Sequence, residues 1–135
     1  MKDTARRAIV VALLVVAAGA SSASGRQEPA PARVVEITAE RFEFVPSEIT
    51  AQEGETLEFR LTSQDTIHGF RLVGPDGTGR DVAIPKRGRG DVRVRFNATA
   101  EGRYTFECSR LCGAGHGFMR GTVNVKARPA QGGGS

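Results

Sequence analysis

Hydrophobic residues in the middle of this chain recur at every second position, and this alternation restricts the fold more than any other feature. Leu57, Phe59 and Leu61 alternate with polar neighbours in TLEFRLT, as do the apolar residues of DVRVRFN, GRYTFEC and MRGTVNV. Because successive side chains of a β-strand point to opposite faces, a period of two indicates strands with one buried face. Turn signals at residues 45–47 and 74–77 separate such runs. We therefore expect an all-β sandwich or barrel of about seven or eight short strands, with no long helix.

The first 24 residues have the layout of a secretory signal. Basic residues precede an apolar run from Ala8 to about Ala20, and small residues follow it. A membrane-spanning helix needs about 20 apolar residues, so we expect a cleaved signal, with an uncleaved anchor as the alternative. This implies a periplasmic or otherwise extracytoplasmic location. The rest of the chain divides into a linker at 25–33, one folded domain at 34–127 and a flexible tail at 128–135.

The net charge does not indicate a nucleic-acid partner. Without the first 24 residues, the chain has 16 basic and 14 acidic residues, and so small an excess gives no electrostatic footprint for nucleic acid. The charges are unevenly distributed along the chain. Residues 36–58 contain seven glutamates and one arginine, whereas residues 80–128 contain eleven basic and four acidic residues. We expect an electrically polarised domain, provided that the fold does not interleave the two segments.

Four side chains with metal-binding chemistry are concentrated in residues 108–119, CSRLCGAGHGFM. Cys108 and Cys112 are the only cysteines of the chain, and His116 and Met119 follow them closely. The strand pattern places Cys108 at the buried end of one strand and Met119 at the buried start of the next. The intervening loop contains three glycines, which allow its backbone to fold tightly. Such a loop is able to present a metal site at one end of a sandwich.

The residue types alone leave two interpretations of this cluster. In an exported protein, two neighbouring cysteines commonly form a disulfide. Alternatively, the thiols, the imidazole and the thioether converge on one metal, and this donor set suits copper better than zinc, which has little use for a thioether. The only other histidine, His68, begins an apolar strand and is expected at the same end, which favours copper. A thiol oxidoreductase is poorly supported, because the spacing is not Cys-x-x-Cys.

The two segments together resemble the CuA domain of cytochrome c oxidase subunit II. The resemblance rests on SQDTIHGF at residues 63–70 and on GRYTFECSRLCGAGHGFM at residues 102–119. It extends over residues 36–127 and is closest to the thermophile-type subunit II, which has a single N-terminal anchor.

This resemblance implies a cupredoxin-like Greek-key β-sandwich that holds two copper ions in a binuclear CuA-type centre. Cys108 and Cys112 are implied to bridge both ions. His68 and Met119 would complete the ligands of one copper, and His116 with the backbone carbonyl of Arg110 would complete those of the other. Asp65 is implied as a residue that orients the His68 segment, although a solvated turn acid explains it equally well. The implied function is single-electron transfer, with no chemical catalysis by this chain alone.

The resemblance further implies a redox partner such as a c-type cytochrome or an oxidase core, with any membrane association through the N-terminal segment. Two departures change the expected contact with that partner. The chain has no tryptophan, whereas the family commonly has an aromatic residue near the site. Arg110 stands where many relatives have glutamate and, with Arg120, makes the copper end basic, so we expect a partner with an apolar or acidic patch. The alternatives are a subunit of a membrane terminal oxidase, a mononuclear cupredoxin and a copper-delivery protein.

Overall fold

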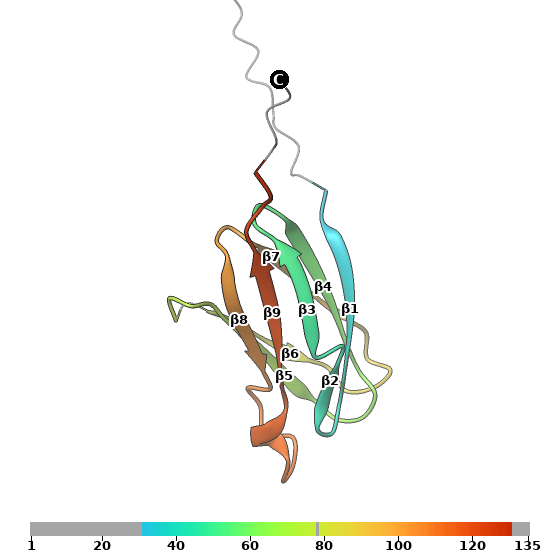
Figure 1. The fold of residues 1–135 in the computed structure, drawn as a ribbon. Helices are drawn as coiled ribbons and strands as arrows, with labels where there is room; N and C mark the ends of the chain where they lie inside the picture. The colour runs from blue at the N-terminus through green and yellow to red at the C-terminus, as the bar shows by residue number, and fades with distance from the viewer. Residues whose placement is uncertain (1–30, 78, 131–135) are drawn as a thin grey trace, which may run out of the picture.

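The structure of the protein, a computed structural model, describes residues 31–77 and 79–130. These residues form nine strands in two sheets that pack face to face (Figure 1), which confirms the predicted all-β sandwich. The described residues include a single short 3₁₀ helix and no helix that is long and apolar enough to cross a membrane. The signal expected at residues 1–24, most of the linker and the larger part of the tail lie outside the described residues.

The first sheet has four strands in the order β2-β1-β4-β7. Its strands are β1 (Arg33–Glu40), β2 (Glu43–Val45), β4 (Thr56–Ser63) and β7 (Val92–Asn97). β1 runs parallel to β4, whereas β2 and β7 are antiparallel to their neighbours. A tight turn at Arg41 and Phe42 joins β1 to β2.

The second sheet has five strands in the order β3-β9-β8-β5-β6. Its strands are β3 (Glu48–Gln52), β5 (His68–Val73), β6 (Gly79–Ile84), β8 (Gly102–Glu107) and β9 (Arg120–Lys126). β3 runs parallel to β9, and the other neighbours are antiparallel. The short helix η1 (His116–Phe118) lies in the connection from β8 to β9.

The structure has nine strands where seven or eight were expected, and the chain changes sheets at the predicted turn around Pro46. Proline has no N–H group to donate to a strand ladder. It therefore interrupts the segment that contains β2 and β3, and these short strands join different sheets.

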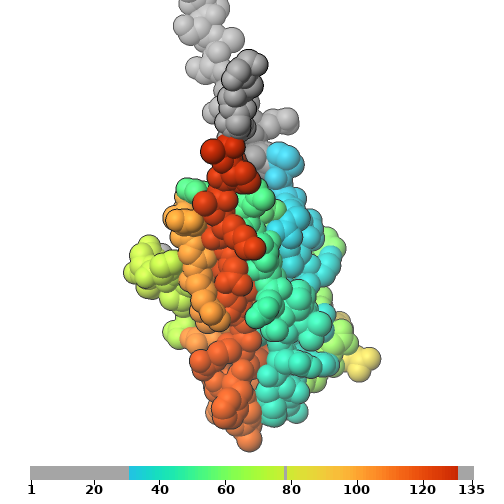
Figure 2. All heavy atoms as spheres, in the orientation of Figure 1, coloured from blue at the N-terminus to red at the C-terminus, as the bar shows by residue number. Residues whose placement is uncertain are grey.

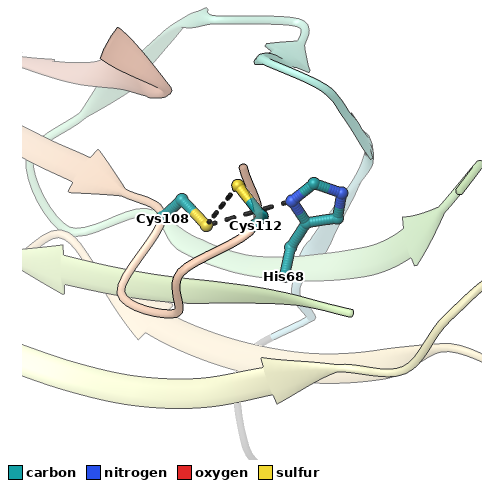
Figure 3. Close-up of side chains that lie close together, drawn as sticks. All are labelled: His68, Cys108 and Cys112. Carbon is teal, nitrogen blue, oxygen red and sulfur yellow. Dashed lines mark hydrogen bonds between the residues drawn. The ribbon is translucent and has the colours of Figure 1, made fainter. Parts of the chain in front are cut away.

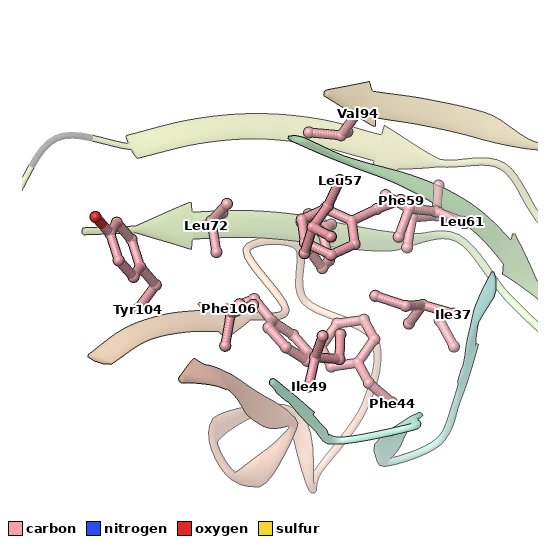
Figure 4. Packing of buried hydrophobic residues seen from close by; sticks show 14 of the residues in the cluster. Ile37, Phe44, Ile49, Leu57, Phe59, Leu61, Leu72, Val94, Tyr104 and Phe106 are labelled. Atoms are coloured by element: carbon pink, nitrogen blue, oxygen red, sulfur yellow. The ribbon is translucent and has the colours of Figure 1, made fainter. Parts of the chain in front are cut away.

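Aromatic side chains from both sheets fill the centre of the sandwich (Figure 4). Four buried rings contact one another with centroid distances between 5.2 and 5.9 Å: Phe44, Phe59, Phe70 and Phe106. Phe70 lies two residues after His68, and Phe106 lies two residues before Cys108. Because side chains two apart on a strand share a face, the packed core fixes the backbone on which these site residues stand.

Candidate metal centre

The connection between β8 and β9 projects from one end of the sandwich and carries most of the expected site residues. This β8–β9 loop, residues 108–119, forms the tip that lies opposite the start of β1 and the end of β9 (Figures 1 and 2). The backbone N–H of Cys108 donates to the carbonyl of Met119 at 2.9 Å, which ties the two ends of the loop together. Both side chains are buried, at 5% and 1% exposure.

The two cysteines are free thiols that face each other below the surface. Their Sγ atoms lie 3.6 Å apart, and each side chain is 5% exposed. A disulfide bond would bring the two sulfur atoms to about 2.05 Å. The structure therefore holds Cys108 and Cys112 as two separate sulfur donors.

His68 reaches the same place from the other expected segment. It is the first residue of β5, its side chain is fully buried, and its Nδ1 atom lies 3.9 Å from Sγ of Cys108 (Figure 3). The donor atoms of His68, Cys108 and Cys112 all lie within 4.8 Å of one another. Two segments that are about forty residues apart in sequence thus meet at one end of the sandwich.

The remaining expected donors also lie beside the two sulfur atoms. Nδ1 of His116 and Sδ of Met119 lie 3.8 Å and 3.9 Å from Sγ of Cys112. The backbone carbonyl oxygen of Arg110 lies 3.1 Å from Sγ of Cys108, while the Arg110 side chain is exposed. Each sulfur atom therefore has one histidine nitrogen and one further donor next to it.

These separations suit donors that share a metal ion. Ligand atoms bound at about 2.0–2.3 Å to one tetrahedral ion lie roughly 3.3–3.8 Å from one another. The observed distances of 3.1–3.9 Å from the sulfur atoms are close to this range. Thiolate, imidazole and thioether are the donors that copper accepts in electron-transfer sites. Both the chemistry and the spacing of the donors therefore fit copper.

Asp65 fixes the orientation of the His68 ring. Its carboxylate lies 2.6 Å from Nε2 of His68 and accepts hydrogen bonds from the backbone N–H groups of Arg41 and Thr66 at 3.0 and 2.7 Å. Partial burial works against ionisation, but these hydrogen bonds outweigh it and lower the pKa of Asp65 to about 2. Because an ionised carboxylate only accepts hydrogen bonds, Nε2 has the proton and Nδ1 faces the sulfur atoms. In the neutral ring, Nδ1 has the lone pair that a metal ion would bind.

The two thiols share an environment that favours a bound cation. Burial, together with the hydrogen bond and the charge of neighbouring Cys108, raises the pKa of Cys112 to about 11. Two adjacent thiolates in a buried site repel each other and lose hydration. A metal ion would supply the positive charge that stabilises both thiolates.

Gly69 and Phe42 contribute to the site although the sequence did not single them out for it. The backbone N–H of Gly69 points toward Sγ of Cys108 at 3.5 Å. A Cβ atom on Gly69 would overlap Oγ of Ser109, so only glycine lets β5 pass this close to the loop. The Phe42 ring packs so closely against Gly115 that a Cβ atom there would overlap it. The glycines in the motif were the only sequence signal of this close packing.

The outer surface of the β8–β9 loop is both apolar and basic. Leu111 and Phe118 each have 85% of their surface exposed, although they directly neighbour the buried Cys112 and Met119 in sequence. Arg110 and Arg120 are exposed on the same loop and at its end. The tip of the molecule therefore presents apolar side chains with arginines beside them.

Comparison with known proteins shows similarity to copper proteins and to oxidase subunits. The family model of the cupredoxin-like domain matches residues 7–125. The cytochrome c oxidase subunit 2 of Thermus thermophilus is 36% identical over 93 residues, which are 68% of this chain and 64% of that protein. The chain thus spans less than two thirds of this curated relative.

Solved structures share the fold. The periplasmic domain of subunit II of cytochrome oxidase of Bradyrhizobium japonicum superposes with a TM-score of 0.59 at 23% identity, covering 73% of this chain and 87% of that chain. A chain of a heme-copper terminal oxidase dimer superposes with a TM-score of 0.55 at 27% identity, covering 70% of this chain and 65% of that chain.

Proposed function

The chain belongs to the family of cupredoxin-like domains, and on this basis we propose that it is an electron-transfer protein with a binuclear copper centre of the CuA type. The observation that carries this proposal is the second thiol. Cys108 and Cys112 face each other at 3.6 Å. Their sulfur atoms each have a histidine Nδ1 atom beside them, His68 at 3.9 Å and His116 at 3.8 Å. This duplicated arrangement favours two ions over one.

We assign the ligands as the resemblance implies. The thiolates of Cys108 and Cys112 would bridge both ions. One copper would also have His68 and, as a weaker donor, Met119. The other would have His116 and, as a weaker donor, the carbonyl of Arg110. Copper would supply a reversible one-electron couple at this position.

The chain shields four of the proposed ligand side chains from water, while His116 is partly exposed. His68 and Met119 are at most 1% exposed, and both cysteines are 5% exposed. Asp65 holds one imidazole in place, and the core anchors both ligand-bearing segments. Ligands that are held in a fixed arrangement move little when one electron is gained or lost, which favours fast electron transfer.

The tip of the β8–β9 loop is the surface that we assign to the redox partner. Leu111 and Phe118, which neighbour proposed ligands in sequence, provide exposed apolar surface, and Arg110 and Arg120 provide positive charge. This combination fits a partner that has an apolar patch bordered by carboxylates. A c-type cytochrome as donor and an oxidase core as acceptor follow from the names of the relatives, and we place the domain outside the cytoplasm.

A second candidate function is that of a permanent subunit of a membrane terminal oxidase. The similarity to oxidase subunits favours it. In that assembly the same centre would pass electrons to catalytic subunits, and the protein would be recovered from membranes with those subunits.

Copper reconstitution of the reduced protein tests the proposal. We expect two copper ions per chain, and an electron paramagnetic resonance spectrum in which one unpaired electron is shared between two copper nuclei. A single copper ion per chain would show a mononuclear cupredoxin instead. Rapid transfer of the copper to an acceptor protein, without reversible redox chemistry, would show a delivery protein.

A further inference from the structure

We propose that Arg41, in the turn between β1 and β2, is a positioning residue that fastens the β8–β9 loop to the His68 segment and tunes the metal centre. The inference rests on the proposed function for its redox consequence, but its structural part concerns the metal-free protein as well. Arg41 is distant from both segments in sequence, 71 residues before Cys112, and no metal-ligand motif includes it.

Two hydrogen bonds connect Arg41 to the two ligand-bearing segments. Its side-chain Nε donates to the backbone carbonyl of Cys112 at 2.8 Å. Its backbone N–H donates to Oδ2 of Asp65 at 3.0 Å, and the other oxygen of that carboxylate lies 2.6 Å from Nε2 of His68. A single residue thus joins the peptide of one proposed ligand to the carboxylate that orients another.

The residue after Arg41 adds an apolar contact to the same loop. The Phe42 ring lies where a Cβ atom on Gly113 would come within 2.9 Å of it and a Cβ atom on Gly115 would come closer still. The ring therefore covers the stretch that directly follows Cys112. The turn holds the loop by a polar contact on one residue and by close packing on the next.

The guanidinium group also places a positive charge beside the centre. Among the described residues, Arg41 forms no ion pair that would compensate this charge. Because like charges repel, a cation beside a copper centre disfavours the oxidised state, which has one more positive charge than the reduced state. We therefore infer that the charge of Arg41 raises the reduction potential. Its hydrogen bonds to the carbonyl of Cys112 and to Asp65 hold the two ligand-bearing segments together, and we infer that they slow the release of copper.

Three variants of the full-length protein separate these contributions. Arg41→Met removes the charge and the donor but keeps a similar length, and Arg41→Lys keeps the charge and one donor. Arg33→Met is the control, because Arg33 lies at the opposite end of β1 and its guanidinium likewise donates to a backbone carbonyl, that of Thr50 at 2.8 Å. Arg33 also forms an ion pair with Glu55, whereas Arg41 has no such pair within the described part of the chain, so the loss of Arg33 should cost the fold at least as much. Circular dichroism checks that each variant folds, and Arg41→Gln replaces Arg41→Met if the latter does not.

The first measurement uses the reduced, metal-free protein. The rate at which the two buried thiols react with DTNB under native conditions reports how often the β8–β9 loop opens. We expect Arg41→Met to raise this rate about tenfold and Arg41→Lys to raise it less. Arg33→Met should leave it unchanged after correction for any loss of global stability.

The second measurement uses the copper-loaded protein. We expect Arg41→Met to release copper to a chelator about tenfold faster and to have a lower reduction potential, whereas Arg41→Lys should keep a potential close to that of the wild type. Thiol reactivity and copper release that match Arg33→Met would overturn the inference even if the protein binds two copper ions. If the protein binds fewer than two ions, the proposed function fails, but the thiol measurement still decides the role of Arg41.

Discussion

At the scale of single residues, the Asp65–His68 pair determines how an imidazole is presented to the site. The carboxylate lies 2.6 Å from Nε2, and His68 is fully buried. Since the carboxylate accepts the hydrogen bond from Nε2–H, the other nitrogen, Nδ1, faces Cys108 and in the neutral ring is free to bind a metal ion. From the sequence, Asp65 could equally be interpreted as a solvated turn residue. In the structure it orients His68, a proposed ligand.

Replacement of Asp65 by asparagine should weaken copper binding while leaving the fold intact. The amide has nearly the same shape, but it lacks the negative charge that holds the Nε2 proton. We expect about a tenfold loss of copper affinity, measured by competition with a chelator. Asp91→Asn is the matched control, since Asp91 pairs with Arg60 and Arg93 on the outer face of the first sheet. Equal affinities of the two variants would contradict the assigned role of Asp65.

The Arg33–Glu55 pair should contribute to stability in a pH-dependent way. The hydrogen bond from Arg33, opposed by partial burial and supported by the backbone N–H of Gln52, lowers the pKa of Glu55 from its ordinary 4.5. A lowered folded-state pKa stabilises the fold fully above the unfolded-state pKa, and this stabilisation is lost as the pH falls through the folded-state value.

The pH dependence can be measured by urea denaturation of Glu55→Gln. We expect this variant to be less stable than the wild type by about 0.5–1 kcal/mol at pH 7, because both partners are partly exposed. The difference should shrink as the pH is lowered below about 4.5. A difference that stays constant down to pH 2 would show that the carboxylate charge is not its cause.

At the scale of elements, the turn between β1 and β2 and the β8–β9 loop form one packed unit. Gly115 lets the loop backbone lie directly against the Phe42 ring, whereas a Cβ atom on Gly117 in the same loop would have no neighbouring atom within 4 Å. The two glycines therefore differ in the packing that a methyl group would meet, although both lie in the same motif.

This difference gives a matched pair of variants. Gly115→Ala should force the ring or the loop to shift and should lower the free energy of unfolding by about 1–3 kcal/mol, with a loss of copper affinity. Gly117→Ala should be nearly neutral in both measurements. Thermal denaturation of the metal-free protein and chelator competition of the loaded protein test the pair. Equal behaviour of the two alanine variants would mean that the Phe42 contact does not constrain the loop.

At the scale of the whole molecule, the acidic segment at residues 36–58 and the basic segment at residues 80–128 do not form separate faces on the first sheet. Pairing of β4 with β7 brings the two segments together, with an ion pair from Glu58 to Arg93. The expectation of a polarised domain therefore does not hold on this sheet. Arg110 and Arg120 remain exposed at the tip, where Asp81 accepts a hydrogen bond from Ser109 of the same loop.

Small charged redox reagents can measure this local charge without knowledge of the partner. We expect the reduced copper protein to react faster with hexacyanoferrate(III), an anion, as ionic strength is lowered, and slower with hexaammineruthenium(III), a cation. Arg120→Gln should reduce both trends. Rates with the anionic reagent that fall at low salt would exclude a basic contact surface and, with it, an acidic partner.

The class of fold and the candidate donors could be predicted from local sequence alone. The period-two pattern of segments such as TLEFRLT reports which side chains face the core, because strand geometry alternates residue by residue. The motif in residues 108–119 likewise keeps its donors close through a short loop. Local spacing is sufficient for the strands and for these loop donors. His68 comes from a distant segment and reaches the loop through the pairing of β5 with β8.

The contribution of the turn between β1 and β2 to the site became visible only in the folded chain. The roles of Arg41 and Phe42 depend on the turn between β1 and β2 reaching a loop about seventy residues later. The separation of β2 from β3 and the cancellation of charge across β4 and β7 depend equally on sheet pairing. Such contacts are set by the global arrangement of the strands, and the local sequence has no periodic pattern that encodes them.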